Sequence, residues 1–91
     1  IINERSRVMS PLKARINEIE SAITSAERQL TRDNESLVAA SQRGDGKAIM
    51  DLSMSIHEAK KQIDSLFDEL EMITVEHDAL AREFEERLRE I

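Results

Sequence analysis

Cysteine, tryptophan and tyrosine are absent from this 91-residue sequence, which also has only two phenylalanines, two glycines and one proline. The lack of cysteine excludes disulfides, thiolate metal sites and a catalytic thiol. So few glycines and prolines leave little material for the turns of a compact α/β enzyme or for the hairpins of a β-sandwich. No apolar run approaches the length of a membrane span, and no signal peptide opens the chain. These absences favour one all-α domain that has no membrane partner.

Hydrophobic residues make up 40% of the chain and charged residues 35%, a balance that is typical of long helices. Apolar residues recur at alternating steps of three and four, which is the a/d spacing of a coiled-coil seam. Asp33 interrupts the first of two such runs, and His77 and Arg87 interrupt the second. The seam positions are Met9, Leu12, Ile16, Ile19, Ile23, Ala26, Leu30, Asp33, Leu37 and Ala40, then Ile49, Leu52, Ile56, Ala59, Ile63, Leu66, Leu70, Ile73, His77, Leu80, Phe84, Arg87 and Ile91.

A polar segment over residues 41–46 separates the two runs and contains both glycines. Either Gly44 or Gly46 can take the left-handed conformation that ends a helix, because glycine has no Cβ to clash. Asp45 can then cap the next helix with its carboxylate. The segment therefore predicts a helix, a tight turn and a second helix.

Folding the chain back at this turn tests whether the two runs belong together. Ala40 then lies opposite Ile49, and the pairing continues layer by layer until Met9 lies opposite Leu80. Every layer joins an a position to a d position, as an antiparallel coiled coil requires. Two unrelated helices would have no reason to stay in phase across the turn. We therefore predict an all-α fold, a two-helix antiparallel coiled-coil hairpin.

The start of the first helix is indicated by Ser10-Pro11, because proline at the first helical position loses no backbone hydrogen bond. The short N-terminal segment before Pro11 is expected to be a helical or extended return segment that is kinked at this dipeptide. The chain lacks an initiator Met and stops inside a helical pattern, so we interpret it as a fragment of a larger protein. The predicted hairpin domain consists of a lead-in over residues 1–9, a first helix over 10–40, a turn over 41–46 and a second helix over 47–91.

The second helix is longer than the first, so its last residues, 81–91, need cover. Residues 1–9 supply that cover, or an absent partner does, in which case we expect a homodimer through the 81–91 end. Further apolar residues lie outside the seam, where they either widen it or meet another surface. These outer residues are Val38, Met50, Met54, Phe67, Met72 and Val75.

Motifs that resemble catalytic or cofactor sites are incomplete in this sequence. Residues 44–47 (GDGK) look like the end of a phosphate loop, but Ser41 stands where the first glycine belongs and Ala48 follows the lysine. His57-Glu58 begins like a zinc-protease helix, but Lys61 occupies the position of the second histidine. We therefore expect no catalytic residue, no metal ligand and no cofactor in this chain, which is not itself an enzyme.

The polar residues inside the seam have a structural interpretation. His77, opposite Leu12, loosens the base of the hairpin or fixes its register, and a pH switch is the alternative. Asp33, opposite Ile56, is interpreted as a register or flexibility device near the turn.

The net charge of −6 belongs to the second half of the chain. Residues 1–40 hold six basic and six acidic side chains, whereas residues 47–91 hold six basic and twelve acidic ones. From Asp64 to Asp78 there are six acids and no lysine or arginine. A nucleic-acid surface must therefore be local, and with so few aromatic side chains to stack on bases it would bind phosphates in a salt-sensitive way. The candidate residues are Arg5, Arg7, Lys13 and Arg15 near the base, Arg28 and Arg32 midway, and Arg43, Lys47, Lys60 and Lys61 towards the turn.

Three segments carry a resemblance to a known family: residues 10–20 (SPLKARINEIE), the Gly-Asp-Gly turn at 44–46 and residues 63–70 (IDSLFDEL). Together they resemble the C-terminal coiled-coil domain of ABC-F ATPases, the soluble Uup-like branch of the ABC superfamily. The resemblance spans nearly the whole chain. In that family two ATPase cassettes precede a helical hairpin of about this length.

The resemblance implies a cytoplasmic parent ATPase that binds ATP and Mg in its cassettes, with no ATP-binding residue in this chain. It also implies that the hairpin is a non-catalytic accessory domain that helps the parent to engage nucleic acid, either DNA or ribosomal RNA. A protein-interaction or dimerisation coiled coil and a rigid spacer between flanking domains are the alternatives that the residues leave open.

Overall fold

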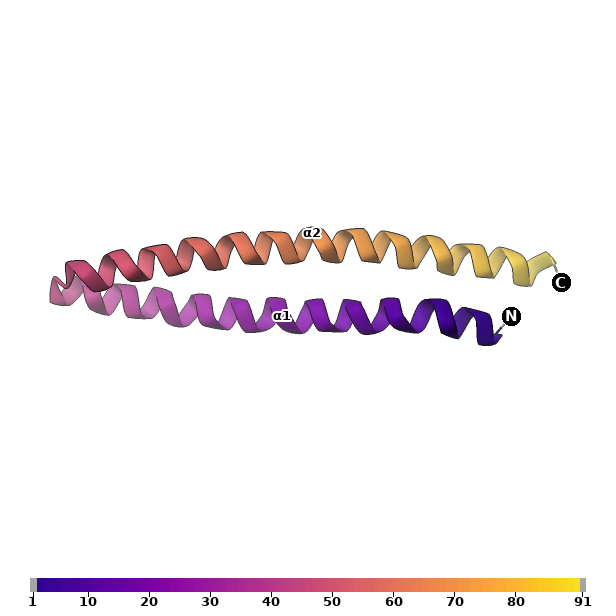
Figure 1. Cartoon of the computed structure of the whole chain (residues 1–91), viewed down its shortest axis with the longest axis horizontal. Helices are drawn as coiled ribbons and strands as arrows, with labels where there is room; N and C mark the ends of the chain where they lie inside the picture. Colours follow the sequence, from indigo (N-terminus) through magenta and orange to yellow (C-terminus); the bar gives the residue numbers. More distant parts are fainter. Residues whose placement is uncertain (1, 91) are drawn as a thin grey trace. The chain divides into compact units, whose positions relative to one another are not determined.

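The computed structural model describes residues 2–90, with side chains for residues 4–89. This part of the chain forms two α-helices and no strand: α1 spans Ile2–Arg43 and α2 spans Gly46–Glu90. Figure 1 shows the chain reversing after α1, so that α2 runs antiparallel to it. The predicted all-α helical hairpin is confirmed.

The reversal is built from one glycine and one aspartate. Gly44 has a φ of 68°, a left-handed conformation that glycine adopts without steric cost. Its N–H donates to the carbonyl of Ser41 (3.2 Å), and the N–H of Asp45 donates to the carbonyl of Ala40 (3.0 Å), which together make a Schellman motif. The Asp45 carboxylate then caps α2 by accepting a hydrogen bond from the N–H of Ala48 (3.1 Å). The predicted glycine stop and aspartate cap are both present, and Gly44 is the glycine that takes the left-handed conformation.

The helix boundaries at the turn differ slightly from the expected ones. α1 ends at Arg43 rather than at residue 40, and α2 begins at Gly46 rather than at residue 47. Most of the expected turn over residues 41–46 is therefore helical, because a Schellman motif followed directly by an N-cap needs very few residues.

The chain divides into two compact units, each of which pairs a stretch of α1 with a stretch of α2. The terminal unit comprises Ile1–Ser21 and Asp68–Ile91, and the turn unit comprises Ala22–Phe67. Each unit has its own part of the seam as a core. The buried hydrophobic residues are Met9, Ile19 and Phe84 in the terminal unit, and Ile23, Ala40, Ile56 and Ile63 in the turn unit.

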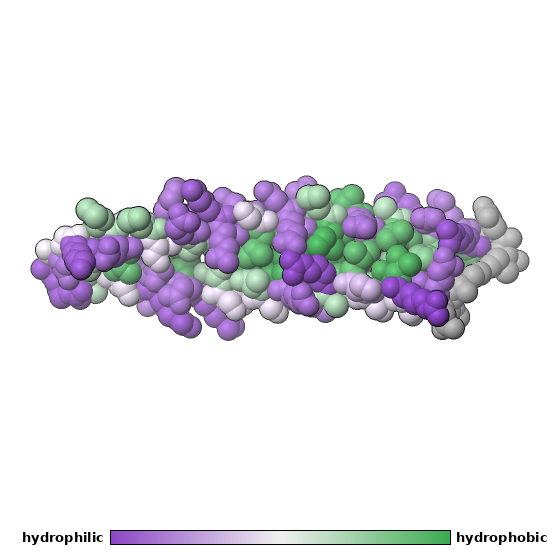
Figure 2. Space-filling model, viewed as in Figure 1, coloured by the Kyte–Doolittle hydropathy of each residue, from purple (hydrophilic) through white to green (hydrophobic). Residues whose placement is uncertain are grey.

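Burial along both helices follows the predicted a/d seam. Every seam position among the described side chains is buried or half-buried except Arg87, and Ile91 lies outside the described residues. Figure 2 shows this on one face, where hydrophobic side chains gather along the line at which the helices meet and hydrophilic side chains border them. Because each fully buried Leu, Ile or Phe contributes about 1.5–3 kcal/mol, this seam supplies most of the packing free energy in each unit.

α1 begins earlier than the expected start at Ser10-Pro11. Residues from Ile2 onward are helical, and Pro11 lies inside the helix rather than at its first turn. An interior proline removes one backbone hydrogen bond and costs about 3 kcal/mol. The continuous helix keeps Met9 in the seam of the terminal unit, where it and Phe84 are each only 4% exposed. Burial of these two side chains offsets the cost of the proline.

Candidate interaction surfaces

Charged side chains flank the seam of the terminal unit and join its two helices. The Nε of Arg15 on α1 donates to Oε1 of Glu69 on α2 (3.1 Å), and its Nη1 donates to Glu18 on its own helix (3.1 Å). The hydrogen bond to Glu69, assisted by the one to Glu18, raises the pKa of Arg15 above its ordinary value. Arg15 was a candidate for phosphate binding, and the structure instead engages it within the hairpin.

The register of the seam explains this pair, although we did not predict it. Arg15 and Glu69 each directly precede an a position, Ile16 and Leu70, so both are g positions. In an antiparallel coiled coil the g positions of the two helices face each other along the same side of the seam. Extending the heptad from the a/d positions to the flanking ones would therefore have identified the pair from the sequence.

The end of the terminal unit is closed by Phe84 and Arg87. Phe84 is buried, and the guanidinium of Arg87 lies over its ring at 5.3 Å from the ring centroid. Arg87 also donates to Glu83 (2.8 Å) and, across the helices, to Glu4 (3.4 Å). Glu4 of the N-terminal segment thus contacts the end of α2, while Leu88 stays 46% exposed, and Ile91 lies outside the described residues.

The polar residue of the turn unit's seam, Asp33, is buried and hydrogen-bonded. Its Oδ1 accepts from Nε2 of Gln29 one turn earlier (3.0 Å), and its Oδ2 accepts from Oγ of Ser55 on α2 (3.2 Å). Ser55 is the neighbour of Ile56, the residue predicted to lie opposite Asp33. A buried carboxylate with two donors is tolerated in this one pairing, since a slipped register would leave it without Ser55.

The polar residue of the terminal unit's seam, His77, is satisfied only in part. Its ring is half-buried, and its Nδ1 lies 3.3 Å from Oδ1 of the neighbouring Asp78. Its Nε2 is buried and has no hydrogen-bond partner among the described residues. Because an unsatisfied buried polar atom costs about 1–3 kcal/mol, the His77 layer is weaker than an aliphatic layer.

The ten basic residues predicted as phosphate-binding candidates are all exposed. The ion pairs found among the described residues all lie in the terminal unit. None of the six candidates in the turn unit makes a hydrogen bond or ion pair with any residue whose side chain is described. The candidates are Arg5, Arg7, Lys13 and Arg15 in the terminal unit, and Arg28, Arg32, Arg43, Lys47, Lys60 and Lys61 in the turn unit.

These six turn-unit cations, as we call them, are spread around both helices. Lys60 directly follows the seam residue Ala59 and so borders the seam, whereas Arg28 and Lys61 occupy outer f positions of their helices. Arg43 and Lys47 lie on either side of the turn. The structure therefore presents the six cations along the turn unit and does not gather them into one pocket.

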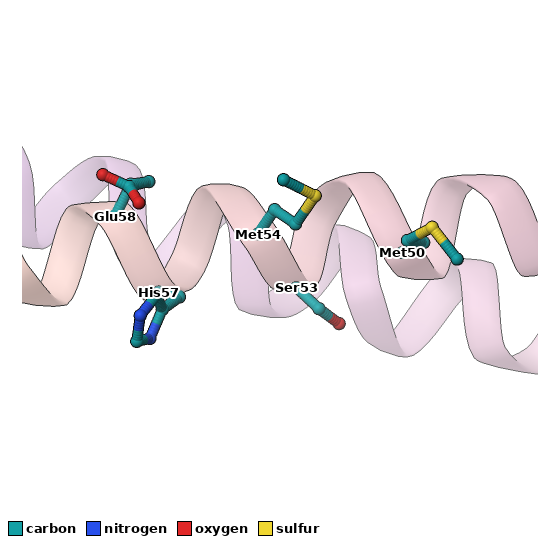
Figure 3. Close-up of a pocket in the computed structure, with 5 residues that line it drawn as sticks. All are labelled: Met50, Ser53, Met54, His57 and Glu58. Carbon is teal, nitrogen blue, oxygen red and sulfur yellow. The ribbon is translucent and has the colours of Figure 1, made fainter.

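An open hollow of about 300 Å³ lies along α2 in the turn unit. It is lined by Met50, Ser53, Met54, His57 and Glu58, all from this one helix. In Figure 3 the side chains of Met54 and Glu58 lie on one side of the helix, and those of Ser53 and His57 on the other. They do not converge on a common point, and the described residues contain no group of three or more His, Cys, Asp or Glu side chains placed to hold a metal ion.

No family model matches this sequence, and no curated protein and no solved structure shows significant similarity to it. In the part of the chain that the structure describes, neither helix is long and apolar enough to cross a membrane.

Proposed function

We propose that this chain is a non-catalytic accessory hairpin that engages the phosphate backbone of nucleic acid, DNA or ribosomal RNA, through its turn unit. The observation that carries the proposal is the set of six turn-unit cations, which are exposed and have no partner among the described side chains. Lysine and arginine side chains that neutralise phosphates release the cations condensed on the nucleic acid. This release is a main source of affinity for a nucleic-acid backbone.

The two units differ in charge, and the difference favours the turn unit. The terminal unit has seven basic and twelve acidic side chains, a net charge of −5, whereas the turn unit has six and seven, a net charge of −1. Exposed charges are screened over about 8 Å at physiological salt, so a phosphate near the turn unit responds mainly to that unit's own side chains. The terminal unit would repel a polyanion.

The aromatic residues support backbone contacts rather than base recognition. Phe84 is buried, and Phe67 is 48% exposed but lies between Asp64 and Asp68 on its helix. Stacking on bases needs accessible rings in a basic groove, and the described surface has none. We therefore expect binding that is weakly sequence-dependent and strongly salt-dependent.

The resemblance to ABC-F ATPases supports the same function from another direction. Its segments 10–20, 44–46 and 63–70 lie on α1, at the turn and on α2. In such a protein the cassettes would bind ATP and Mg, and the hairpin would add contacts to the nucleic acid. We assign no ATP-binding residue to this chain.

Fluorescence anisotropy with labelled duplex DNA, branched DNA and a ribosomal RNA fragment, at a series of salt concentrations, tests the proposal. Two double variants in the turn unit, R43Q/K47Q and K60Q/K61Q, each remove two cations. Each is expected to weaken binding and to lower the slope of log affinity against log salt by about one for each phosphate that is no longer neutralised.

The matched control is R82Q/R89Q, which removes two exposed cations from the terminal unit. R82Q/R89Q makes the net charge more negative by two, as each turn-unit variant does. Neither Arg82 nor Arg89 has a hydrogen bond or ion pair with the described side chains, so the control removes no contact within the hairpin. An equal loss of affinity in this control would show that only net charge matters and would contradict the assignment to the turn unit. Failure of the chain to bind any of the three probes or intact ribosomes at low salt would contradict the function itself.

A further inference from the structure

The outer side of α2 in the terminal unit presents two apolar side chains to solvent. Met72 is 73% exposed and Val75 is 64% exposed. They are three residues apart, so they are neighbours on the helix surface. Their positions in the heptad, c and f, point away from α1, so neither contributes to the seam.

Carboxylates surround this apolar pair on the same helix. Asp68 precedes Met72 by one turn and Glu76 follows it by one turn, while Glu71 lies beside it. None of these three makes a hydrogen bond or ion pair with the described side chains, in contrast to Glu69, which Arg15 binds. No lysine or arginine occurs on α2 between residues 68 and 79. We call Asp68, Glu71, Met72, Val75 and Glu76 the acidic–apolar face.

We propose that the acidic–apolar face binds a basic amphipathic helix of a partner protein. Met72 and Val75 would pack against apolar residues that recur at one-turn spacing on the partner, as two neighbouring helices pack along their apolar faces. The carboxylates on either side would pair with lysine or arginine beside those apolar residues, as the e and g positions of a coiled coil do. This site is in the other unit from the six turn-unit cations and does not depend on the proposed function.

Charge complementarity decides among the occupants of this face. A second copy that paired the same face with itself would bring carboxylates against carboxylates, which opposes a symmetric dimer there. Nucleic acid is excluded by the same repulsion. A cationic helix gains both from the carboxylates and from covering Met72 and Val75, and methionine is enriched in protein interfaces. Two anchoring side chains make a small contact, so we expect association that weakens as salt rises.

The probe is a synthetic fluorescent helical peptide of leucine and lysine, with leucine at one-turn spacing, titrated with the whole chain at low and moderate salt. We expect M72Q/V75Q to weaken binding by about tenfold or more, and D68N/E71Q/E76Q to weaken it and to flatten its salt dependence. Glutamine keeps helix propensity close to that of methionine, and circular dichroism checks that each variant is folded.

Met50 and Met54 of the turn unit provide the matched control. They are 66% and 65% exposed, similar to Met72 and Val75, but the acids that border them, Asp51 and Glu58, are accompanied on the same helix by Lys47 and Lys61, whereas no lysine or arginine accompanies the acids around Met72 and Val75. M50Q/M54Q is expected to bind the peptide as the unmodified chain does.

Three results would overturn the proposal. One is equal binding of a peptide with the same composition but scrambled order, which would show charge attraction without an apolar contact. Another is unchanged binding by M72Q/V75Q. The third is a dimer in sedimentation velocity that M72Q/V75Q converts to a monomer, since that would assign the face to a second copy of the chain.

Discussion

At the scale of single residues, the two polar side chains in the seam behave differently. Asp33 is buried with a donor from its own helix and a donor from α2, so removing one donor leaves a carboxylate oxygen unsatisfied. His77 already has one such atom, the buried Nε2. Hydrogen bonds to charged groups contribute about 1.5–3 kcal/mol, and an unsatisfied buried group costs a similar amount. Asp33 therefore selects one register, and His77 weakens its layer.

Replacing Ser55 tests the role of Asp33. We expect Ser55→Ala to lower the free energy of unfolding by about 1–3 kcal/mol, because Asp33 Oδ2 loses its only donor from α2. The double variant D33L/S55A is expected to recover that loss, since an apolar pair needs no donor. Urea unfolding followed by circular dichroism measures both. Ser53→Ala, at an exposed serine on the same helix, is the control and should change stability by less than about 0.5 kcal/mol. Equal stability of S55A and S53A would show that Ser55 does not support Asp33.

At the scale of helices, the first turns of α1 persist against local preference. Pro11 lies in the interior of α1, where it costs about 3 kcal/mol. The terminal unit compensates through Met9 and Phe84, both buried, and through Arg87, which bridges to Glu4. Packing of one helix against the other, rather than helix propensity, holds these turns in place.

Truncation of Phe84 tests this dependence. Phe84→Ala is expected to cost about 3 kcal/mol or more and to speed amide hydrogen exchange in residues 4–9, because the terminal unit loses one of the three buried hydrophobic side chains described in it, Met9, Ile19 and Phe84. Phe67→Ala, at a half-exposed ring of the same size in the turn unit, should cost less and should leave exchange in residues 4–9 unchanged. Thermal unfolding and exchange mass spectrometry measure the two effects. If both variants accelerated exchange in residues 4–9 equally, Phe84 would not be what holds that segment.

At the scale of the whole molecule, acidic side chains outnumber basic ones. The chain carries −6, of which the terminal unit carries −5. The ion pairs in that unit join exposed or half-buried side chains, and such surface pairs contribute little, typically between zero and about 1 kcal/mol each. We therefore expect repulsion among the carboxylates of α2 to outweigh the ion pairs at low salt.

Raising salt should consequently stabilise the protein. We expect the unfolding temperature to rise by several degrees between low and physiological ionic strength, since 1 kcal/mol corresponds to about 4–8 °C for a chain of this size. D68N/E71Q should raise the unfolding temperature at low salt and reduce its dependence on salt. Differential scanning calorimetry measures both quantities. An unfolding temperature that fell as salt rose would show that the ion pairs, and not the repulsion, dominate.

The sequence predicted the core of the fold more fully than it predicted the surface. The a/d positions, a glycine stop at Gly44 or Gly46 and the cap at Asp45 followed from periodicity and turn chemistry, which act over a few residues, and the structure assigned the stop to Gly44. The start of α1 did not follow, because the local signal at Ser10-Pro11 was opposed by burial of Phe84, a residue far along the chain. The proposed phosphate-binding surface was predicted only as a set of cations, since a pattern of charges does not show which of them, like Arg15, has a partner.

What the sequence determined by itself is the repeat of apolar side chains, and with it two helices that meet in one antiparallel register. This is so because helical periodicity places every a and d residue on one side, and the turn sets which layers face each other. Only the tertiary structure decided which charges are engaged across the helices, that helix continues through Pro11, and which apolar side chains stay exposed on α2. Those outcomes depend on contacts between residues far apart in the chain, where packing and burial outweigh local preference.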